Sequence, residues 1–378
     1  MRFFFVGILF IASAAWAKPN VVYINIDDLG IMDLGYTGST YYETPNIDRL
    51  ASQAMVFTQG YAPAANCAPS RAACMSGLYG PRTGVLTVAS SARGKAATRK
   101  LIPIKNKTVL AEKFVTIAEA LQATGYATAT MGKWHLGQDP TTQGFDLNIA
   151  GTTAGHPRSY FSPYHNKKLS DGPKGEHLPA RLTDEAIQWI EKVKDKPFFL
   201  YLPYFSIHTP IQGRGDLVKK YKSKKPGDGQ SNAKYAAMVE AVDEHIGRLL
   251  AKLDEWKLTE NTLVIFTSDN GGICAMSSQK PFRAGKGSYY EGGIREPLII
   301  RWPAKVKPGR NDTPVSGIDF YPTLLEATGA EKPADTPLDG VSLMPLLTGS
   351  GELKPRALFW HFPIYLQAYN KNKDDGRD

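Results

Sequence analysis

The sequence contains few cysteines and, after its first residues, no long hydrophobic run. Only three cysteines, Cys67, Cys74 and Cys274, occur in 378 residues, which is too few for a disulfide framework. Whether Cys74 and Cys274 pair stays open at this point, because the distance between them decides such a bond. No internal repeat or low-complexity tract is visible. These absences indicate an ordinary globular chain rather than a disulfide-stapled or membrane-spanning one.

The first residues have the features of a secretory signal peptide. A basic start precedes an apolar stretch that ends in Ala15-Trp16-Ala17, so residues 1–17 are predicted to be cleaved off. The apolar stretch is too short to span a membrane, and no cysteine follows it to carry a lipid. We therefore expect a periplasmic or secreted protein without a membrane anchor.

The charge balance favours an anionic partner. The formal net charge is +9, and 42% hydrophobic with 21% charged residues is ordinary for a globular protein with a large core. Because export argues against nucleic acid, a polyanionic glycan is the expected partner. The lysine-rich run 219–225 is interpreted as a solvated loop, and the basic segment 89–107 as a surface insertion. The polar tail 370–378 is expected to fray.

Apolar runs alternate with helical patterns along the chain, which predicts an α/β sheet covered by helices on both faces. The predicted strands are 20–28, the stretch around 127–135, 197–208, 261–269 and 297–303. The predicted helices are 45–57, 116–124, 183–193 and 232–256. Ligands of such sheets gather at the carboxyl ends of the strands, where the candidate residues of this chain fall.

Two pairs of oxygen-bearing side chains follow predicted strands. Asp27-Asp28 comes after the run 21–26, and Asp269-Asn270 comes after the run 263–268. Adjacent acids repel one another unless a cation or hydrogen-bond donors compensate them. Carboxylate and amide oxygens suit Ca²⁺ and also Mg²⁺. The alternative is that each aspartate caps a turn or helix after its strand.

Cys67 opens the run Cys67-Ala68-Pro69-Ser70-Arg71, which has the C-x-P-x-R pattern. Pro69 suits the first turn of a helix, whose free N–H groups stabilise negative charge. Arg71 adds a permanent charge with donors suited to an oxyanion or a carboxylate. The alternative is a small buried cysteine at the start of a helix.

Three further segments place cations and imidazoles after apolar runs. Lys133 and His135 lie in the run Gly-Lys-Trp-His-Leu-Gly, and His208 ends the apolar stretch that starts at Phe198. Lys286 lies in an extended G-K-x-x-x-x-E-G-G pattern. A lysine can hold an oxyanion as a point charge, and an imidazole can transfer a proton near neutral pH.

Taken together, these motifs resemble the type I sulfatases over roughly Asn20 to Leu347, most closely the bacterial arylsulfatase A-like and N-acetylgalactosamine-sulfatase-like enzymes. The resemblance implies an alkaline phosphatase-like fold with a large, mostly parallel mixed sheet. It also implies that Cys67 is oxidised to formylglycine, whose hydrate attacks sulfur. The implied calcium ligands are Asp27, Asp28, Asp269, Asn270 and an oxygen of the modified Cys67.

The resemblance also assigns the remaining roles. Lys133 would bind a sulfate oxygen, and His135 would take a proton from the aldehyde hydrate. His208 would be the general acid for the departing alcohol, with Lys286 on the leaving oxygen, while Arg71, Lys133 and Lys286 supply positive charge. The other histidines, 156, 165, 177, 245 and 361, have no motif around them.

The chain departs from the family pattern at its end. Family members usually continue beyond the position of Asp378 with a small C-terminal sheet and helix. We therefore expect a catalytic domain over 18–347 and the start of a truncated C-terminal subdomain over 348–378.

The expected function is that of an exported sulfatase acting on a sulfated carbohydrate. Its maturation partner would be either a formylglycine-generating enzyme or a radical sulfatase-maturating enzyme. Two alternatives stay open: a phosphonate monoester or phosphodiester hydrolase of the same superfamily, and a catalytically inactive protein that binds sulfated glycans.

Overall fold

The structure is a computed structural model that describes residues 18–227 and 229–366. The predicted signal peptide, 1–17, and the predicted frayed tail, 370–378, lie outside the described residues. Within the described part of the chain, no helix has both the length and the apolar character that crossing a membrane requires.

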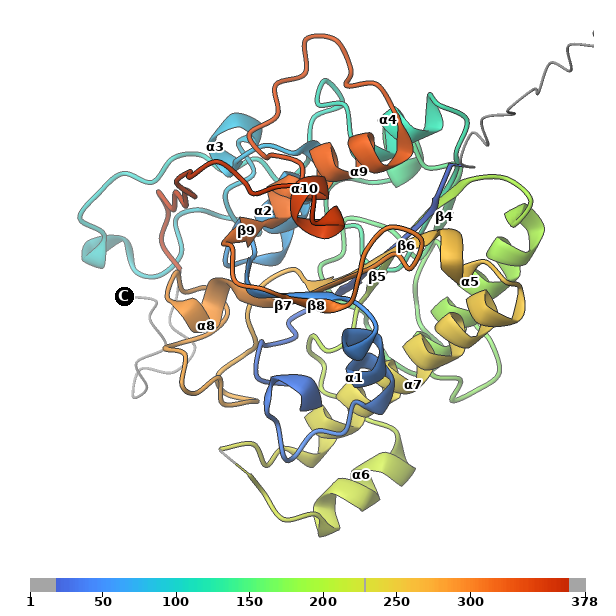
Figure 1. The fold of residues 1–378 in the computed structure, drawn as a ribbon. Coiled ribbons are helices and arrows are strands. Elements are labelled where there is room, and N and C mark those ends of the chain that lie inside the picture. Colours follow the sequence, from blue (N-terminus) through green and yellow to red (C-terminus); the bar gives the residue numbers. More distant parts are fainter. Residues whose placement is uncertain (1–17, 228, 367–378) are drawn as a thin grey trace, which may run out of the picture.

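A nine-stranded sheet runs through the centre of the molecule (Figure 1). Its order is β4-β3-β5-β1-β6-β7-β2-β8, with β9 paired to β2. All pairs are parallel except those that β7 makes with β6 and β2, so the predicted mixed, mostly parallel sheet is confirmed. The strands are β1 (Asn20–Ile26), β2 (Met55–Tyr61), β3 (Ala127–Met131), β4 (Leu147–Ile149), β5 (Phe198–Tyr204), β6 (Thr262–Ser268), β7 (Arg295–Arg301), β8 (Gly309–Asn311) and β9 (Val315–Ser316).

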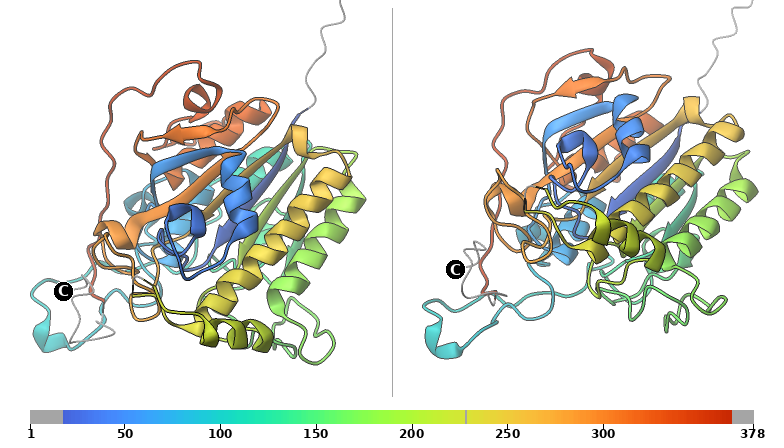
Figure 2. Two further views of the ribbon diagram at one scale, coloured as in Figure 1. Left: turned by 60° about the horizontal axis from the view of Figure 1, so that its bottom comes forward. Right: turned by 90° about the horizontal axis from the view of Figure 1, so that it is seen from below.

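Helices cover both faces of the sheet, as Figures 1 and 2 show. One face carries α1 (Pro45–Ser52), α5 (Leu178–Val193) and α7 (Ala233–Glu255), and α6 (Gly215–Ser223) packs against α7 on the same side. The other face carries α2 (Cys67–Ser76), α4 (Ile117–Gln122), α9 (Phe320–Thr328) and α10 (Met344–Thr348). The short helices α3 (Gly80–Thr83) and α8 (Glu291–Ile294) lie in connections.

The central strands are apolar because both of their faces are buried. In β1 the side chains of Val22 and Ile24 join the core beneath α5 and α7, while Val21 and Tyr23 join the core beneath α2 and α9. This alternation follows from the two-residue period of a strand. The sheet therefore separates two hydrophobic cores and holds its strand ends in fixed positions.

The prediction of one helix over 45–57 was wrong at its carboxyl end. Helix α1 ends at Ser52, and β2 begins at Met55. Residues Met55 and Val56 pair with Ile300 and Ile299 of β7. This pairing spans more than two hundred residues of sequence, so the helical pattern of the segment could not reveal it.

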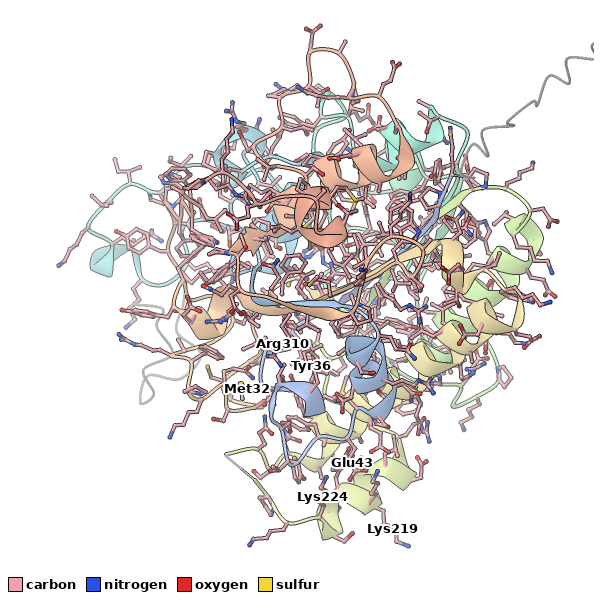
Figure 3. The ribbon with its side chains drawn as sticks, viewed as in Figure 1. Met32, Tyr36, Glu43, Lys219, Lys224 and Arg310 are labelled. Carbon is pink, nitrogen blue, oxygen red and sulfur yellow. The ribbon has the colours of Figure 1, made fainter. Side chains whose placement is uncertain are left out.

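The predicted solvated loop 219–225 was also wrong, because α6 covers most of it. The apolar side chains of Leu217 and Tyr221 are buried and anchor the helix. Lys224 points toward Glu43, which it contacts at 2.8 Å, whereas Lys219 points away from the protein (Figure 3). Within the run, Lys219 and Lys222 therefore lie on the polar face of an amphipathic helix, and Tyr221 lies on its buried face.

The predicted surface insertion 89–107 contacts the end of the described chain. The Arg93 N–H donates to the carbonyl of Tyr365, and the Tyr365 N–H donates to the carbonyl of Ser91. Leu101 and Ile102 are exposed, which agrees with a surface segment. These backbone contacts place residues 91–93 and 365–366 at one side of the candidate site described below.

Candidate active site

The predicted site residues follow strands whose carboxyl ends lie at one edge of the sheet. Strands β1 and β6 run in register, with Ile26 opposite Ser268, so that Asp27 and Asp269 are delivered side by side. Strand β5 pairs with β1 on its other side and is followed by His208. Strand β3 pairs with β5 and is followed by Lys133. Parallel pairing thus gathers residues from distant parts of the sequence.

Helix α2 begins at Cys67, shortly after the carboxyl end of β2. Cys67 is 2% exposed, and its Sγ lies within 4.8 Å of ligand atoms of Asp27 and Asp269, and also of Asp28 and His208. Burial raises the pKa of the Cys67 thiol to about 12, although Lys133 and Lys286 oppose this effect. The unmodified side chain is therefore a protonated thiol at neutral pH, and a poor nucleophile as such.

Arg71 connects the helix to the carboxylates. Its Nε lies 2.8 Å from Oδ2 of Asp269, and its Nη1 donates to the carbonyl of Lys133 at 2.8 Å. Both members of the Arg71–Asp269 pair are fully buried. The ion pair keeps the pKa of Arg71 well above its ordinary value even though burial opposes its charge. The predicted positive charge beside residue 67 is therefore permanent.

Lys133 and Lys286 each contact one of the adjacent aspartates. Lys133 Nζ lies 2.6 Å from Oδ2 of Asp27, and Lys286 Nζ lies 2.6 Å from Oδ1 of Asp28. Gly132 permits the contact between Lys133 and Asp27, because its φ of 133° turns the chain after β3. This turn also explains why β3 ends at Met131 and not near His135, as the sequence predicted.

The two adjacent aspartates differ in their electrostatics. Burial raises the pKa of Asp27 to about 8; Lys133 opposes this effect, whereas Asp269 adds to it. Burial also opposes the ionisation of Asp28, but Lys286 and His208 outweigh it and lower the pKa of Asp28. Burial therefore dominates at Asp27, where Lys133 does not outweigh it, whereas the neighbouring cations dominate at Asp28.

The side-chain oxygen atoms that accept no hydrogen bond in this cluster suit a hard cation. Oδ1 of Asp27 and Oδ1 of Asn270 are buried without a hydrogen-bond partner among the described residues. The carboxylates of Asp27 and Asp269 approach one another, and the N–H of Asp28 donates to Oδ1 of Asp269 at 3.2 Å. Carboxylate and amide oxygens are the ligands that Ca²⁺ prefers. The residues present therefore fit the predicted cation site.

The two predicted proton-transfer residues lie at the cavity above Cys67. Burial lowers the pKa of His135 to about 2, with further lowering by Lys133. Burial lowers the pKa of His208 to about 3 despite the nearby Asp28 carboxylate. Both imidazoles are therefore neutral at neutral pH in the absence of an anion. Nδ1 of His208 donates to the carbonyl of Thr209 at 2.9 Å, which leaves its Nε2 as a proton acceptor.

A cavity of about 290 Å³ opens above Cys67 and is walled by His135, His208 and Lys286. All the residues predicted from the sequence thus lie in or directly beneath this cavity, including the four predicted cation ligands. Their roles stay predictions. No disulfide links Cys74 to Cys274 in the structure.

The wall of the cavity also contains residues that were not predicted, and two of them, His156 and Arg93, have ionisable side chains. His156 stacks on His208 with ring centroids 5.9 Å apart and an interplanar angle of 9°, and Arg93 comes from the surface insertion. His156 lies in the loop that follows the short strand β4. Recognising that strand would have pointed to this loop, but the sequence pattern did not predict it. Nothing in the sequence around Arg93 distinguishes it from the other basic residues of its segment.

Comparison with known proteins shows the family to which this fold belongs. The sulfatase family model matches residues 19–330, so the chain belongs to the sulfatase family and is a sulfuric ester hydrolase. Solved structures of sulfatases with the alkaline phosphatase-like fold resemble it over most of its length.

Several relatives illustrate this membership. The chain is 37% identical to a sulfatase of Formosa agariphila, over 93% of this chain and 77% of that protein. It is 31% identical to the N-acetylgalactosamine-6-sulfatase of Canis lupus familiaris, over 93% of this chain and 70% of that protein. The crystal structure of Ps i-CgsB has a TM-score of 0.75 and 32% identity, and covers 88% of this chain and 77% of its own.

Proposed function

We propose that this protein is an exported sulfatase that removes sulfate from a sulfated glycan, using formylglycine formed from Cys67 and a bound divalent cation, Ca²⁺ in preference to Mg²⁺. The observation that carries the proposal is the position of Cys67. It begins α2 with its Sγ beside three buried carboxylates, at the floor of a cavity walled by Lys286 and two neutral imidazoles.

The relatives support a carbohydrate substrate. One structure of Ps i-CgsB is a complex with k-i-k-neocarrahexaose, and that protein is 32% identical to this chain. Several curated relatives are N-acetylgalactosamine-6-sulfatases. The net charge of +9 favours the approach of a polyanion. A phosphonate monoester hydrolase shares the fold at 21% identity, which supports the fold alone.

The cation and the modified residue would supply the reactive groups. Asp27, Asp28, Asp269 and Asn270 would hold the cation, which polarises a bound sulfate, and oxidation of Cys67 to an aldehyde would provide a hydrated nucleophile. Maturation by a formylglycine-generating or a radical sulfatase-maturating enzyme is part of the proposal. Export through the predicted signal peptide, 1–17, is also part of it.

The chain's own residues bind the anion and move protons. Lys286 and Lys133 hold sulfate oxygens as point charges, and Arg71 fixes the carboxylates and the start of α2. Neutral His135 accepts a proton from the hydroxyl at residue 67. An anion entering the cavity raises the pKa of His208, so that its Nε2 takes up a proton and passes it to the departing alcohol.

The proposal is tested on the full chain purified from a host that contains a maturation enzyme. The mass of the peptide containing residue 67 reports whether an aldehyde is present, and ion chromatography follows sulfate release from sulfated saccharides. Cys67→Ala should abolish the release without changing the unfolding transition. Cys74→Ala, at a buried position of the same helix, is the control and should retain the release.

Two results would overturn the proposal. The first is sulfate release by Cys67→Ala at the rate of the natural sequence. The second is an aldehyde-bearing protein that hydrolyses phosphonate monoesters faster than any sulfate ester, which would favour the alternative hydrolase.

A further inference from the structure

A second cavity adjoins the catalytic one, and the two share the side chain of His156. The second cavity has a volume of about 310 Å³, similar to that of the catalytic cavity. It is formed by the segment after His135 and by the loop that follows β4. Its polar lining includes Gln138, Thr152, Thr153, Arg158, His165, Asn166 and Lys167.

Backbone hydrogen bonds fix this second cavity relative to the catalytic residues. The N–H of His135 donates to the carbonyl of Thr152, and the N–H of Gly132 donates to the carbonyl of Ile149, both at 2.9 Å. The N–H of Ala150 donates to the carbonyl of Lys168 at 2.9 Å. The wall of the second cavity is therefore tied to the turn that places Lys133 and His135.

The charge of the second cavity is positive and uncompensated. Arg158 and Lys167 are exposed and form no ion pair among the described residues, and no acidic residue lines the cavity. The carboxylate of Asp139, which follows Gln138 in the chain, is already paired with Lys168. An anion in this cavity would therefore meet two free cations and no opposing carboxylate.

His156 has one ring nitrogen available between the two cavities. Its Nδ1 lies 3.1 Å from the carbonyl oxygen of Pro157, which can only accept, so Nδ1 carries the hydrogen. Its Nε2 is then a hydrogen-bond acceptor. The ring is stacked on that of His208 and lines both cavities, so His156 can contact a ligand that extends from one cavity into the other.

We propose that the second cavity is a subsite for the sugar unit next to the one that loses its sulfate. Arg158 and Lys167 would bind an acidic group of that neighbouring unit, a sulfate or a carboxylate. Gln138, which is exposed in the lining, offers its amide group to a hydroxyl of that unit. The substrate is then an anionic oligosaccharide or polysaccharide, not a single sulfated sugar. This inference rests on the proposed function, because it takes the catalytic cavity to hold the sulfated unit.

The test measures binding separately from catalysis. Calorimetry on the Cys67→Ala protein compares sulfated tetrasaccharides of the galactan and galactosaminoglycan series with the matching sulfated monosaccharides. At least one tetrasaccharide should bind about 10-fold more tightly than its monosaccharide, and the double substitution Arg158→Ala with Lys167→Ala should remove that gain. Tetrasaccharides with the neighbouring unit desulfated, or with its carboxylate reduced, identify which acidic group is bound.

The matched control is the pair Lys196→Ala and Lys307→Ala, which removes the same charge from exposed positions at the opposite edge of the sheet. It should keep the preference for the tetrasaccharide. Equal binding of every tetrasaccharide and its monosaccharide would overturn the subsite, as would a preference that survives the Arg158 and Lys167 substitutions. A mature protein that shows the preference but releases no sulfate would overturn the proposed function and leave the subsite standing.

Discussion

The ammonium nitrogen of Lys286 lies 2.6 Å from Oδ1 and 2.8 Å from Oδ2 of Asp28, in the wall of the cavity that contains Cys67. Burial opposes the charge of Lys286, but Asp28 outweighs it and keeps the pKa of the lysine well above its ordinary value. Lys286 thus brings a fixed positive charge to the point where sulfate would bind. It also competes with a cation for the same carboxylate.

Replacing Lys286 separates these two effects. Lys286→Met should lower kcat for sulfate release by about 100- to 1000-fold, because a preorganised charge on the leaving oxygen is lost. The affinity for Ca²⁺ should not fall, since Asp28 no longer has a competing partner. Sulfate release and calcium calorimetry measure the two quantities. Lys280→Met, at an exposed position of the same loop, should change neither. A large loss of calcium affinity in Lys286→Met would contradict this view of the ion pair.

Two arginine–aspartate pairs of equal length allow a test of burial. Arg71 Nε lies 2.8 Å from Asp269, where both side chains are fully buried, and Arg82 Nε lies 2.8 Å from Asp339, where the arginine is 55% exposed. Arg71→Ala should lower the free energy of unfolding by about 3–5 kcal/mol, because it leaves a buried carboxylate without its partner. Arg82→Ala should lower it by less than about 1 kcal/mol. Urea unfolding in the presence of a chelator measures both, and similar losses would refute the expectation.

His177 should make stability depend on pH. Burial, together with His245 and Arg214, lowers its pKa from the ordinary 6.5 to about 3, and neither ring nitrogen has a hydrogen-bond partner among the described residues. Between these two pH values the unfolded chain binds a proton that the folded protein does not. The contribution of His177 to the free energy of unfolding is therefore fully present above pH 6.5 and is lost as the pH falls toward 3.

Replacing the imidazole should remove this loss. His177→Phe retains the ring contact with Phe161, whose centroid lies 5.2 Å away. Between about pH 7 and pH 5, the natural sequence should lose about 2 kcal/mol more unfolding free energy than the variant, at about 1.4 kcal/mol per pH unit. Urea unfolding at both pH values checks this. The control is His361→Phe, which changes an exposed histidine and should lose as much unfolding free energy between the two pH values as the natural sequence. If His177→Phe also loses that amount, other groups cause the pH dependence.

Alanine substitutions at two glycines should separate the energetic cost of a positive φ from the cost of a steric clash. A Cβ on Gly132, whose φ is 133°, would lie 1.9 Å from the carbonyl oxygen of Pro203, whereas a Cβ on Gly175, whose φ is 84°, would meet nothing within 4 Å. Gly175→Ala should cost about 1–2 kcal/mol of unfolding free energy, which is the strain of a positive φ alone. Gly132→Ala should cost more and should also abolish sulfate release, since the shifted turn displaces Lys133. Full activity in Gly132→Ala would mean that the turn tolerates the displacement.

Much of the cavity above Cys67 could be predicted because its residues follow short, strongly apolar strands. The runs before Asp27, Asp269 and His208 are buried on both faces, and a local pattern is enough to identify such strands. Carboxyl ends of parallel strands meet at one edge, so their polar residues had to gather there. The helix that starts at Cys67 was likewise visible in its local sequence.

The rest depended on contacts between distant segments. Strand β2 exists through its pairing with β7, and the lysine-rich helix α6 exists through the burial of Leu217 and Tyr221. The stacking of His156 on His208, and the second cavity beside them, arise where two loops that follow different strands meet. The amino-acid sequence by itself determined which side chains we expect to carry the chemistry, because local patterns and motif spacing indicate them. Only the tertiary structure decided which of the remaining polar and basic residues lie beside them, since that depends on packing across the whole sheet.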